Sequence, residues 1–153
     1  MIDGLVGTAR RLASSSAKGK PRQSDLRRAI STAYYALFHA LAKDGADLFV
    51  GAAAAHPNNA WSHAYRALDH GFAKTACQKA RGLGFPASLI SCAETFVRLQ
   101  QQRHIADYDP IARFTRTEAA LMVDEAEQAI GDLRAAGRAD RRALAVLIRL
   151  KAR

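Results

Sequence analysis

The sequence predicts an all-α protein that folds as an antiparallel helical bundle. Apolar residues recur at steps of three and four along most of the 153 residues, and almost no segment alternates strictly between apolar and polar. The 10 glycines and 4 prolines are clustered, so long stretches rich in Ala and Leu remain uninterrupted. With 49% hydrophobic and 24% charged residues, the composition is typical of a soluble globule and argues against global disorder or a membrane protein.

The chain is long enough for one domain with its own core. We expect a basic N-terminal helix or arm over residues 1–23, in which residues 2–13 form a weak helix. We expect residues 24–153 to form the bundle, which ends in a basic C-terminal helix. The sequence contains no internal repeat of the length found in solenoid proteins.

The clearest helix starts at Ser24, a good N-cap, and should end near Gly45 or Gly51. A loop with capping residues follows. The apolar spacing then predicts one long helix over residues 60–80, with Gly71 as its weak point.

Three further helices complete the predicted bundle. Pro86 suits the first turn of a helix that should end near Tyr108, because the residue before a proline resists the α conformation. Another helix opens at Thr117-Glu118 and ends at Gly137. A short basic helix over residues 140–150 is the last.

The positive charge is divided unevenly along the chain. Residues 1–28 carry 7 basic and 2 acidic side chains, residues 134–153 carry 7 and 1, and the middle carries 9 and 11. A mildly acidic body with two basic ends suggests a polyanionic partner such as nucleic acid or an anionic membrane surface. A solvated charged rim is the alternative.

Several observations indicate a cytoplasmic protein. No apolar run or cleavage site suited to a signal peptide follows the basic N-terminal residues. The Ser-rich start is also compatible with a transit peptide, although Asp3 and the lack of a long apolar face count against it. Cys77 and Cys92 lack CxxC spacing, so we expect small core residues rather than a zinc site or a disulfide.

Two histidines in the predicted 60–80 helix raise the question of a metal site. His63 and His70 lie seven residues apart, about 10 Å along a helix axis, which is too far for one ion. No third ligand is evident, so we predict no metal and no other cofactor, and expect surface or satisfied core histidines.

A group of aromatic residues on the 24–45 helix could either pack in the core or bind a nucleic acid. It comprises Tyr34, Tyr35 and Phe38, with Arg27, Arg28 and His39 nearby. Such rings and arginines can stack bases and hold phosphates. Tyr34 and Phe38 flank the apolar stripe, so we expect them in the core and the two arginines in water.

A cation at the end of an apolar stripe marks the third candidate site. Arg103 falls on the stripe of Phe96 and Leu99, where it needs a partner. Asp107, one turn further, could pair with it and serve structure alone. A cation, an imidazole and a phenol near a helix end could instead receive a phosphodiester.

Two segments resemble the small stand-alone bacterial HEPN-domain proteins. They are Arg28–His39, RAISTAYYALFH, and Arg103–Pro110, RHIADYDP, and the match covers roughly Ser24 to Leu133. The resemblance implies an antiparallel helical bundle that forms a homodimer. It also implies a relation to metal-independent ribonucleases of toxin-antitoxin or phage-defence systems, which are often encoded beside a minimal nucleotidyltransferase.

Catalytic members of that family carry an arginine, four to six residues, then a histidine. Arg98 and His104 fit this pattern formally. The surrounding segment favours a second register, with Arg103 at the arginine position, His104 after it and Tyr108 where histidine is expected. A tyrosine with an ordinary pKa of about 10 is a poor base at pH 7, whereas a histidine is a good one.

The sequence therefore predicts a HEPN-type module that binds RNA or a cognate protein partner, with weak or no catalysis. The alternative is a metal-independent ribonuclease toxin. The expected catalytic positions are Arg98, Arg103, His104 and Tyr108, and the expected RNA-binding positions are Arg27, Arg28 and Asp107.

Overall fold

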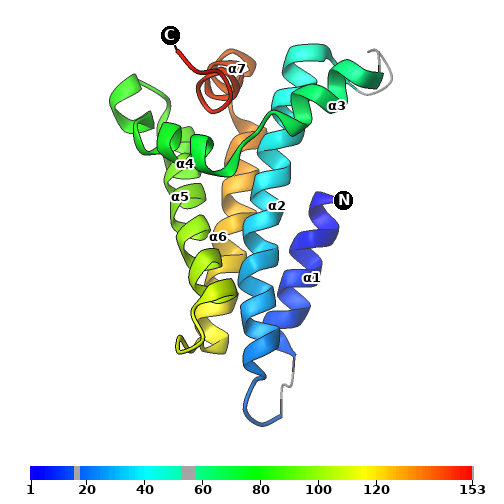
Figure 1. Cartoon of the computed structure of the whole chain (residues 1–153), viewed down its shortest axis with the longest axis vertical. Helices are drawn as coiled ribbons and strands as arrows, with labels where there is room; N and C mark the ends of the chain where they lie inside the picture. Colours follow the sequence, from blue (N-terminus) through cyan, green and yellow to red (C-terminus); the bar gives the residue numbers. More distant parts are fainter. Residues whose placement is uncertain (16–17, 53–57, 153) are drawn as a thin grey trace.

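Four helices of the computed structural model run antiparallel and form the body of the protein (Figure 1). The structure describes residues 1–15, 18–52 and 58–152, and none of these lies in a β-strand. The four body helices are α1 (Ile2–Ser14), α2 (Gln23–Val50), α5 (Ala87–Tyr108) and α6 (Arg116–Ala135). The all-helical prediction is confirmed for this part of the chain.

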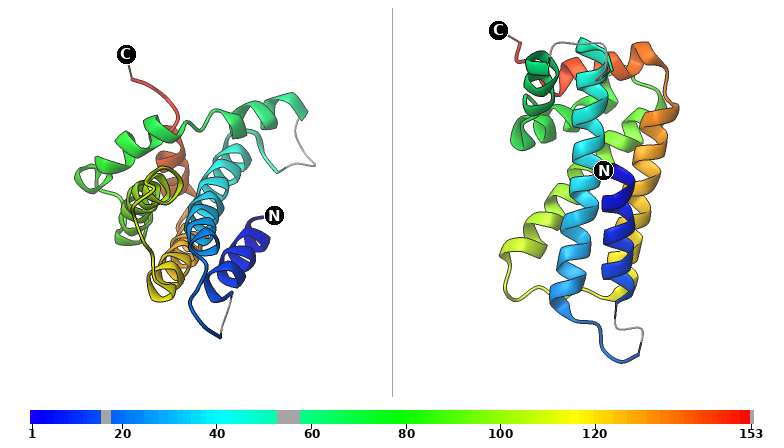
Figure 2. Two further views of the ribbon diagram at one scale, coloured as in Figure 1. Left: turned by 60° about the horizontal axis from the view of Figure 1, so that its bottom comes forward. Right: turned by 90° about the vertical axis from the view of Figure 1, so that its right-hand side faces the viewer.

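Three shorter helices and one 3-10 helix lie at the upper end of the body in Figure 1. They are α3 (Asn58–Arg66), α4 (His70–Gln78), η2 (Ala80–Leu83) and α7 (Arg138–Leu147). The first three form the connection between α2 and α5, and α7 packs on α2. Figure 2 shows α1 lying beside α2 and α6 at the opposite side of the body from α5.

The first segment is helix α1, packed against the bundle through its apolar side. Ile2, Val6, Ala9 and Ala13 are buried between α2 and α6. Arg10 at its polar side forms ion pairs with Asp124 and Glu127 of α6.

Helix α2 is the central element of the fold and packs against α1, α3, α5, α6 and α7. It continues through Gly45 and ends at Gly51, where a φ of 96° favours glycine. Its buried side contains Tyr34 and Phe38, as predicted for core residues.

The prediction of a single helix over 60–80 is wrong. Helix α3 ends at Arg66, and α4 begins at His70 after a turn that buries Leu68 in the core. Asp69 caps the new helix, because its Oδ1 accepts a hydrogen bond from the Phe72 amide at 2.8 Å. The break therefore lies before Gly71, over residues 67–69, between the end of α3 and the start of α4.

The remaining elements begin and end within a few residues of the prediction. Helix α5 ends at Tyr108 as expected, and Thr115 and Glu118 form a capping box at the start of α6. Cys77 and Cys92 are both buried, as expected, and burial raises the pKa of each thiol to about 12.

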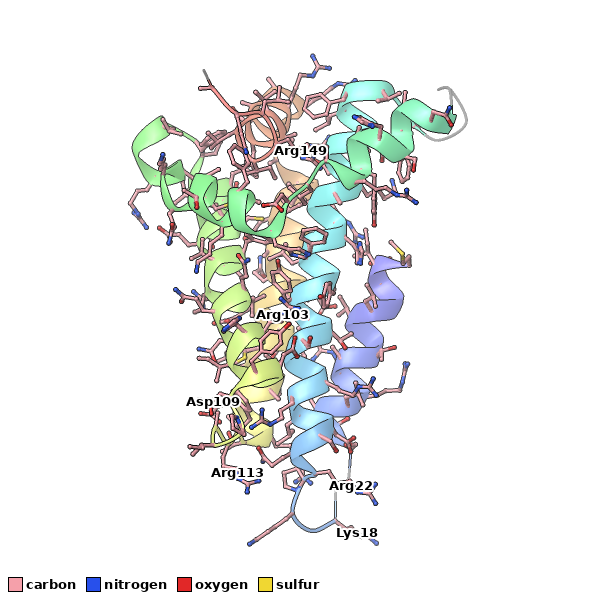
Figure 3. All side chains as sticks on the ribbon, in the orientation of Figure 1. Lys18, Arg22, Arg103, Asp109, Arg113 and Arg149 are labelled. Carbon is pink, nitrogen blue, oxygen red and sulfur yellow. The ribbon has the colours of Figure 1, made fainter. Side chains whose placement is uncertain are left out.

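Helix α7 ends at Leu147, three residues before the predicted end at residue 150, and Arg149 just beyond it is buried (Figure 3). Its Nη2 donates hydrogen bonds to the carbonyl oxygens of Leu41 and Ala42 in α2, at 2.8 and 3.0 Å. Burial lowers the pKa of Arg149 to about 10. Gly45 leaves the space for this guanidinium, since an added Cβ would lie 2.3 Å from Arg149 Cζ.

Gly45→Ala should therefore lower the free energy of unfolding by about 1–3 kcal/mol, because the new methyl group expels the guanidinium from its carbonyl acceptors. Gly131→Ala in α6 is the matched control, since no atom lies within 4 Å of its added Cβ. That control should raise the free energy of unfolding by up to about 1 kcal/mol. Urea unfolding measures both, and equal effects of the two substitutions would contradict the packing described here.

Candidate functional site

The candidate site lies where the last turns of α5 face the middle of α2. Arg103 projects from α5 towards α2, and its side chain is 20% exposed. Its Nη2 donates a hydrogen bond to Tyr35 Oη at 3.0 Å, and its Nε lies 2.8 Å from Asp107 Oδ2. Asp107 is thus the partner that the sequence predicted, and Tyr35 is a second one from the neighbouring helix.

Aromatic rings surround the Arg103 guanidinium. Its Cζ lies 5.9 Å from the Tyr34 ring centroid, 5.4 Å from that of Tyr35 and 5.8 Å from that of Tyr108. Burial alone would lower the pKa of Arg103, but Tyr35, Asp107 and Tyr108 together raise it. The site therefore holds a permanent cation with one buried, one half-buried and one solvent-facing ring beside it.

His104 and Tyr108 form the solvent-facing part of the site. Tyr108 is 64% exposed, and its ring centroid lies 4.9 Å from that of the exposed His104. The structure therefore brings three predicted positions together, Arg103, His104 and Tyr108.

Arg98 lies on another face of α5. Its Nη2 lies 3.0 Å from Glu125 Oε1 of α6. Arg98 and His104 are six positions apart, with five residues between them, which places them about 120° apart around the helix and about 9 Å apart along it. Arg98 and His104, which fit the family's arginine-histidine spacing, therefore do not lie together within one chain.

The predicted RNA-binding residues have different surroundings. Arg27 is half-buried rather than in water, because its guanidinium donates hydrogen bonds to the carbonyl oxygens of Ala106 and Ala112 at the end of α5. Arg28 is exposed. Asp107 is divided between Arg103 and the Ser31 hydroxyl, whose Oγ lies 3.3 Å from its Oδ2.

Sequence reasoning missed the contribution of His70 to this site. Its Nδ1 lies 2.5 Å from the hydroxyl of buried Tyr34, and its ring stacks on Phe38 at a centroid distance of 4.0 Å. The Gln100 amide also donates to its backbone carbonyl at 3.0 Å. Burial, and then the charge of Arg103, lower the pKa of His70. His70 is half-buried with its ring hydrogen-bonded and stacked, between the two alternatives, a surface or a satisfied core histidine, that the sequence offered.

The break between α3 and α4 explains the environments of the two histidines. His63 is exposed on α3, whereas His70 starts α4 and faces the core helices. Asp69 was the signal in the sequence, because an Asp before a helix start is a good cap. Among the described residues, no three His, Cys, Asp or Glu side chains gather closely enough to hold a metal ion.

No protein-family model, curated protein or solved structure matches this chain significantly. In the part of the chain that is described, no helix combines the length and apolar character needed to cross a membrane. The proposed function therefore rests on the residues of the site.

The environment of His70 predicts a dependence of stability on pH. His70 and His39 both have a pKa below the ordinary 6.5, His39 because of burial, so the folded protein binds fewer protons than the unfolded chain. The free energy of unfolding should fall as the pH is lowered from about 7 to about 5. His70→Gln should reduce this fall, as measured by urea unfolding across that range. An unchanged pH dependence in the variant would contradict the assignment.

Proposed function

We propose that this chain is a HEPN-type helical module that binds RNA through Arg103, His104 and Tyr108, with weak or no catalysis, in a bacterial toxin-antitoxin or defence system. The observation that carries the proposal is the position of Tyr108, an exposed ring beside a cation that two neighbours hold in place. Unpaired bases stack on exposed rings, and guanidinium groups bind phosphates.

Weak or absent catalysis follows from the roles of the same groups. RNA cleavage needs a base for the 2′-hydroxyl proton and a cation that steadies charge developing on phosphorus. Asp107 and Tyr35 already engage the Arg103 guanidinium. Tyr108 occupies the position at which catalytic HEPN members have histidine. These groups are better suited to holding RNA than to cleaving it.

Tyr108→Ala should weaken binding of single-stranded RNA about tenfold, because stacking of one base contributes about 1–3 kcal/mol. Leu121→Ala is the control, since it removes another exposed apolar side chain, 56% exposed, from α6. Fluorescence anisotropy with a labelled oligonucleotide measures both affinities at fixed salt. Equal affinities for the two variants would remove Tyr108 from the site, and no binding by the wild type at low salt would remove RNA as the ligand. In that case a cognate protein becomes the better candidate.

A metal-independent ribonuclease is the second candidate, favoured by the exposed imidazole of His104 against Tyr108. His104 could take the proton that Tyr108 cannot. In that case the wild type should degrade total RNA in the presence of EDTA, and His104→Ala should leave it intact. RNA that stays equally intact with both proteins would exclude this activity.

A homodimer and a nucleotidyltransferase partner belong to the same proposal, because the HEPN resemblance implies both. Light scattering at micromolar concentration should give twice the 16.6 kDa mass of the chain. A monomer would count against the dimer, and copurification from the native host would identify the partner.

A further inference from the structure

Two loops that lie far apart in the sequence are joined at the lower end of the body. One connects α1 to α2, and the other connects α5 to α6 (Figure 1). The Gln23 side chain donates to the Phe114 carbonyl at 2.8 Å and accepts from its amide at 2.9 Å. Arg116 Nη2 donates to the Gly19 carbonyl at 3.2 Å. These bonds join Gly19 and Gln23, next to the start of α2, to Phe114 and Arg116, next to the start of α6.

This end of the protein carries five exposed cationic side chains, which we name the basic end. They are Lys18, Lys20, Arg22, Arg28 and Arg113. Figure 3 shows Lys18, Arg22 and Arg113 projecting from the lower end of the body. Within the described part of the chain, none of the five forms an ion pair.

Exposed cations without an ion pair to any described residue also lie elsewhere, among them Arg138, Arg142 and Lys151 at the upper end, but much of the remaining surface carries paired arginines. Several arginines elsewhere lie against carboxylates: Arg10 against Asp124 and Glu127, Arg81 against Glu94, Arg98 against Glu125, Arg134 against Asp3, and Arg141 against Asp44. Such pairing cancels much of their field at a distance. The cations of the basic end keep theirs.

The carboxylates near the basic end are engaged by hydroxyl or backbone groups. Asp25 accepts a hydrogen bond from Ser15 Oγ at 2.9 Å. Asp109 accepts from the amides of Ile111 and Ala112, and these bonds lower its pKa. Glu118 belongs to the capping box of α6. Their charges reduce the positive potential, but the cationic side chains at this end outnumber them.

The two basic termini of the sequence therefore differ in the structure. At the upper end, Asp3 and Asp44 pair with Arg134 and Arg141, and Arg149 is buried, whereas Arg138, Arg142 and Lys151 stay exposed. At the lower end the cations stay exposed and lie next to the end of α5, where Tyr108 is exposed. The phosphate backbone of an RNA whose base stacks on Tyr108 would pass next to the α5–α6 loop, which directly follows Tyr108 in the chain.

We infer that the basic end binds the phosphate backbone of single-stranded RNA whose bases stack at Tyr108. The inference rests on the proposed function and adds a second contact region to it. Exposed cations that form no ion pair attract phosphates, and binding releases counterions from the RNA. A membrane surface would require an apolar face beside the cations, whereas this end exposes Ile111 as its one large aliphatic side chain among the described residues.

The test compares two variants of equal charge change. Lys18→Gln/Arg22→Gln/Arg113→Gln alters the basic end, and Arg138→Gln/Arg142→Gln/Lys151→Gln alters exposed cations at the upper end. Affinity for a labelled unstructured single-stranded RNA is measured by anisotropy between about 50 and 300 mM salt. The basic-end variant should reduce the slope of log affinity against log salt by about 2, because each lost phosphate contact removes about 0.7. The upper-end variant should keep most of the wild-type slope.

The outcomes separate this inference from the proposed function. Equal slopes in the two triple variants, with Tyr108→Ala still weakening binding, would overturn the inference and leave the RNA site at Tyr108. A reduced slope only in the basic-end variant, with no effect of Tyr108→Ala, would support the basic end and remove Tyr108. Binding to phosphatidylserine vesicles and not to RNA would overturn both. Thermal unfolding of each variant confirms that it is folded.

Discussion

The ion pair between Arg103 and Asp107, closed by the Tyr35 hydroxyl, is the interaction on which the candidate site depends. A guanidinium on the apolar stripe of a helix is costly unless it is paired and hydrogen-bonded. Asp107 supplies the charge from the next turn of α5, and Tyr35 supplies an acceptor from α2. The two partners come from different helices, so the position of the cation is fixed by the packing of the body. Tyr108 and His104 then lie beside a charge that is already oriented.

A second arginine, Arg149, is buried and so does not contribute its charge to the upper surface. Arg149 is buried without a carboxylate within hydrogen-bonding distance among the described residues, and backbone carbonyl oxygens of α2 accept its hydrogen bonds. This contact fastens the C-terminal segment to the central helix and takes one cation from the upper surface. Arg134 and Arg141 of the same end are paired with carboxylates, whereas Arg138, Arg142 and Lys151 stay exposed there.

The helices could be predicted from the sequence because apolar periodicity and local caps are local signals. The break at Asp69 was missed because the same alanine-rich periodicity continues on both sides of it, and the burial of Leu68 decides the outcome. Gly45 could not be interpreted as a packing residue, since its partner Arg149 lies more than a hundred residues away in the sequence. The Arg103–Asp107 pair was predictable at one helical turn. Its closure by Tyr35, and the commitment of Arg27 to the α5–α6 loop, depend on how helices pack.

The most direct measurement of the central claim is NMR of the arginine Nε–Hε groups during titration with single-stranded RNA. Arg103 and Arg98 lie on the same helix, and each contacts a carboxylate, which makes Arg98 an internal reference. The account predicts that the Arg103 resonance shifts and saturates together with the ring signals of Tyr108, while the Arg98 resonance stays in place. Saturating RNA that moves other resonances and leaves Arg103 and Tyr108 unchanged would contradict it.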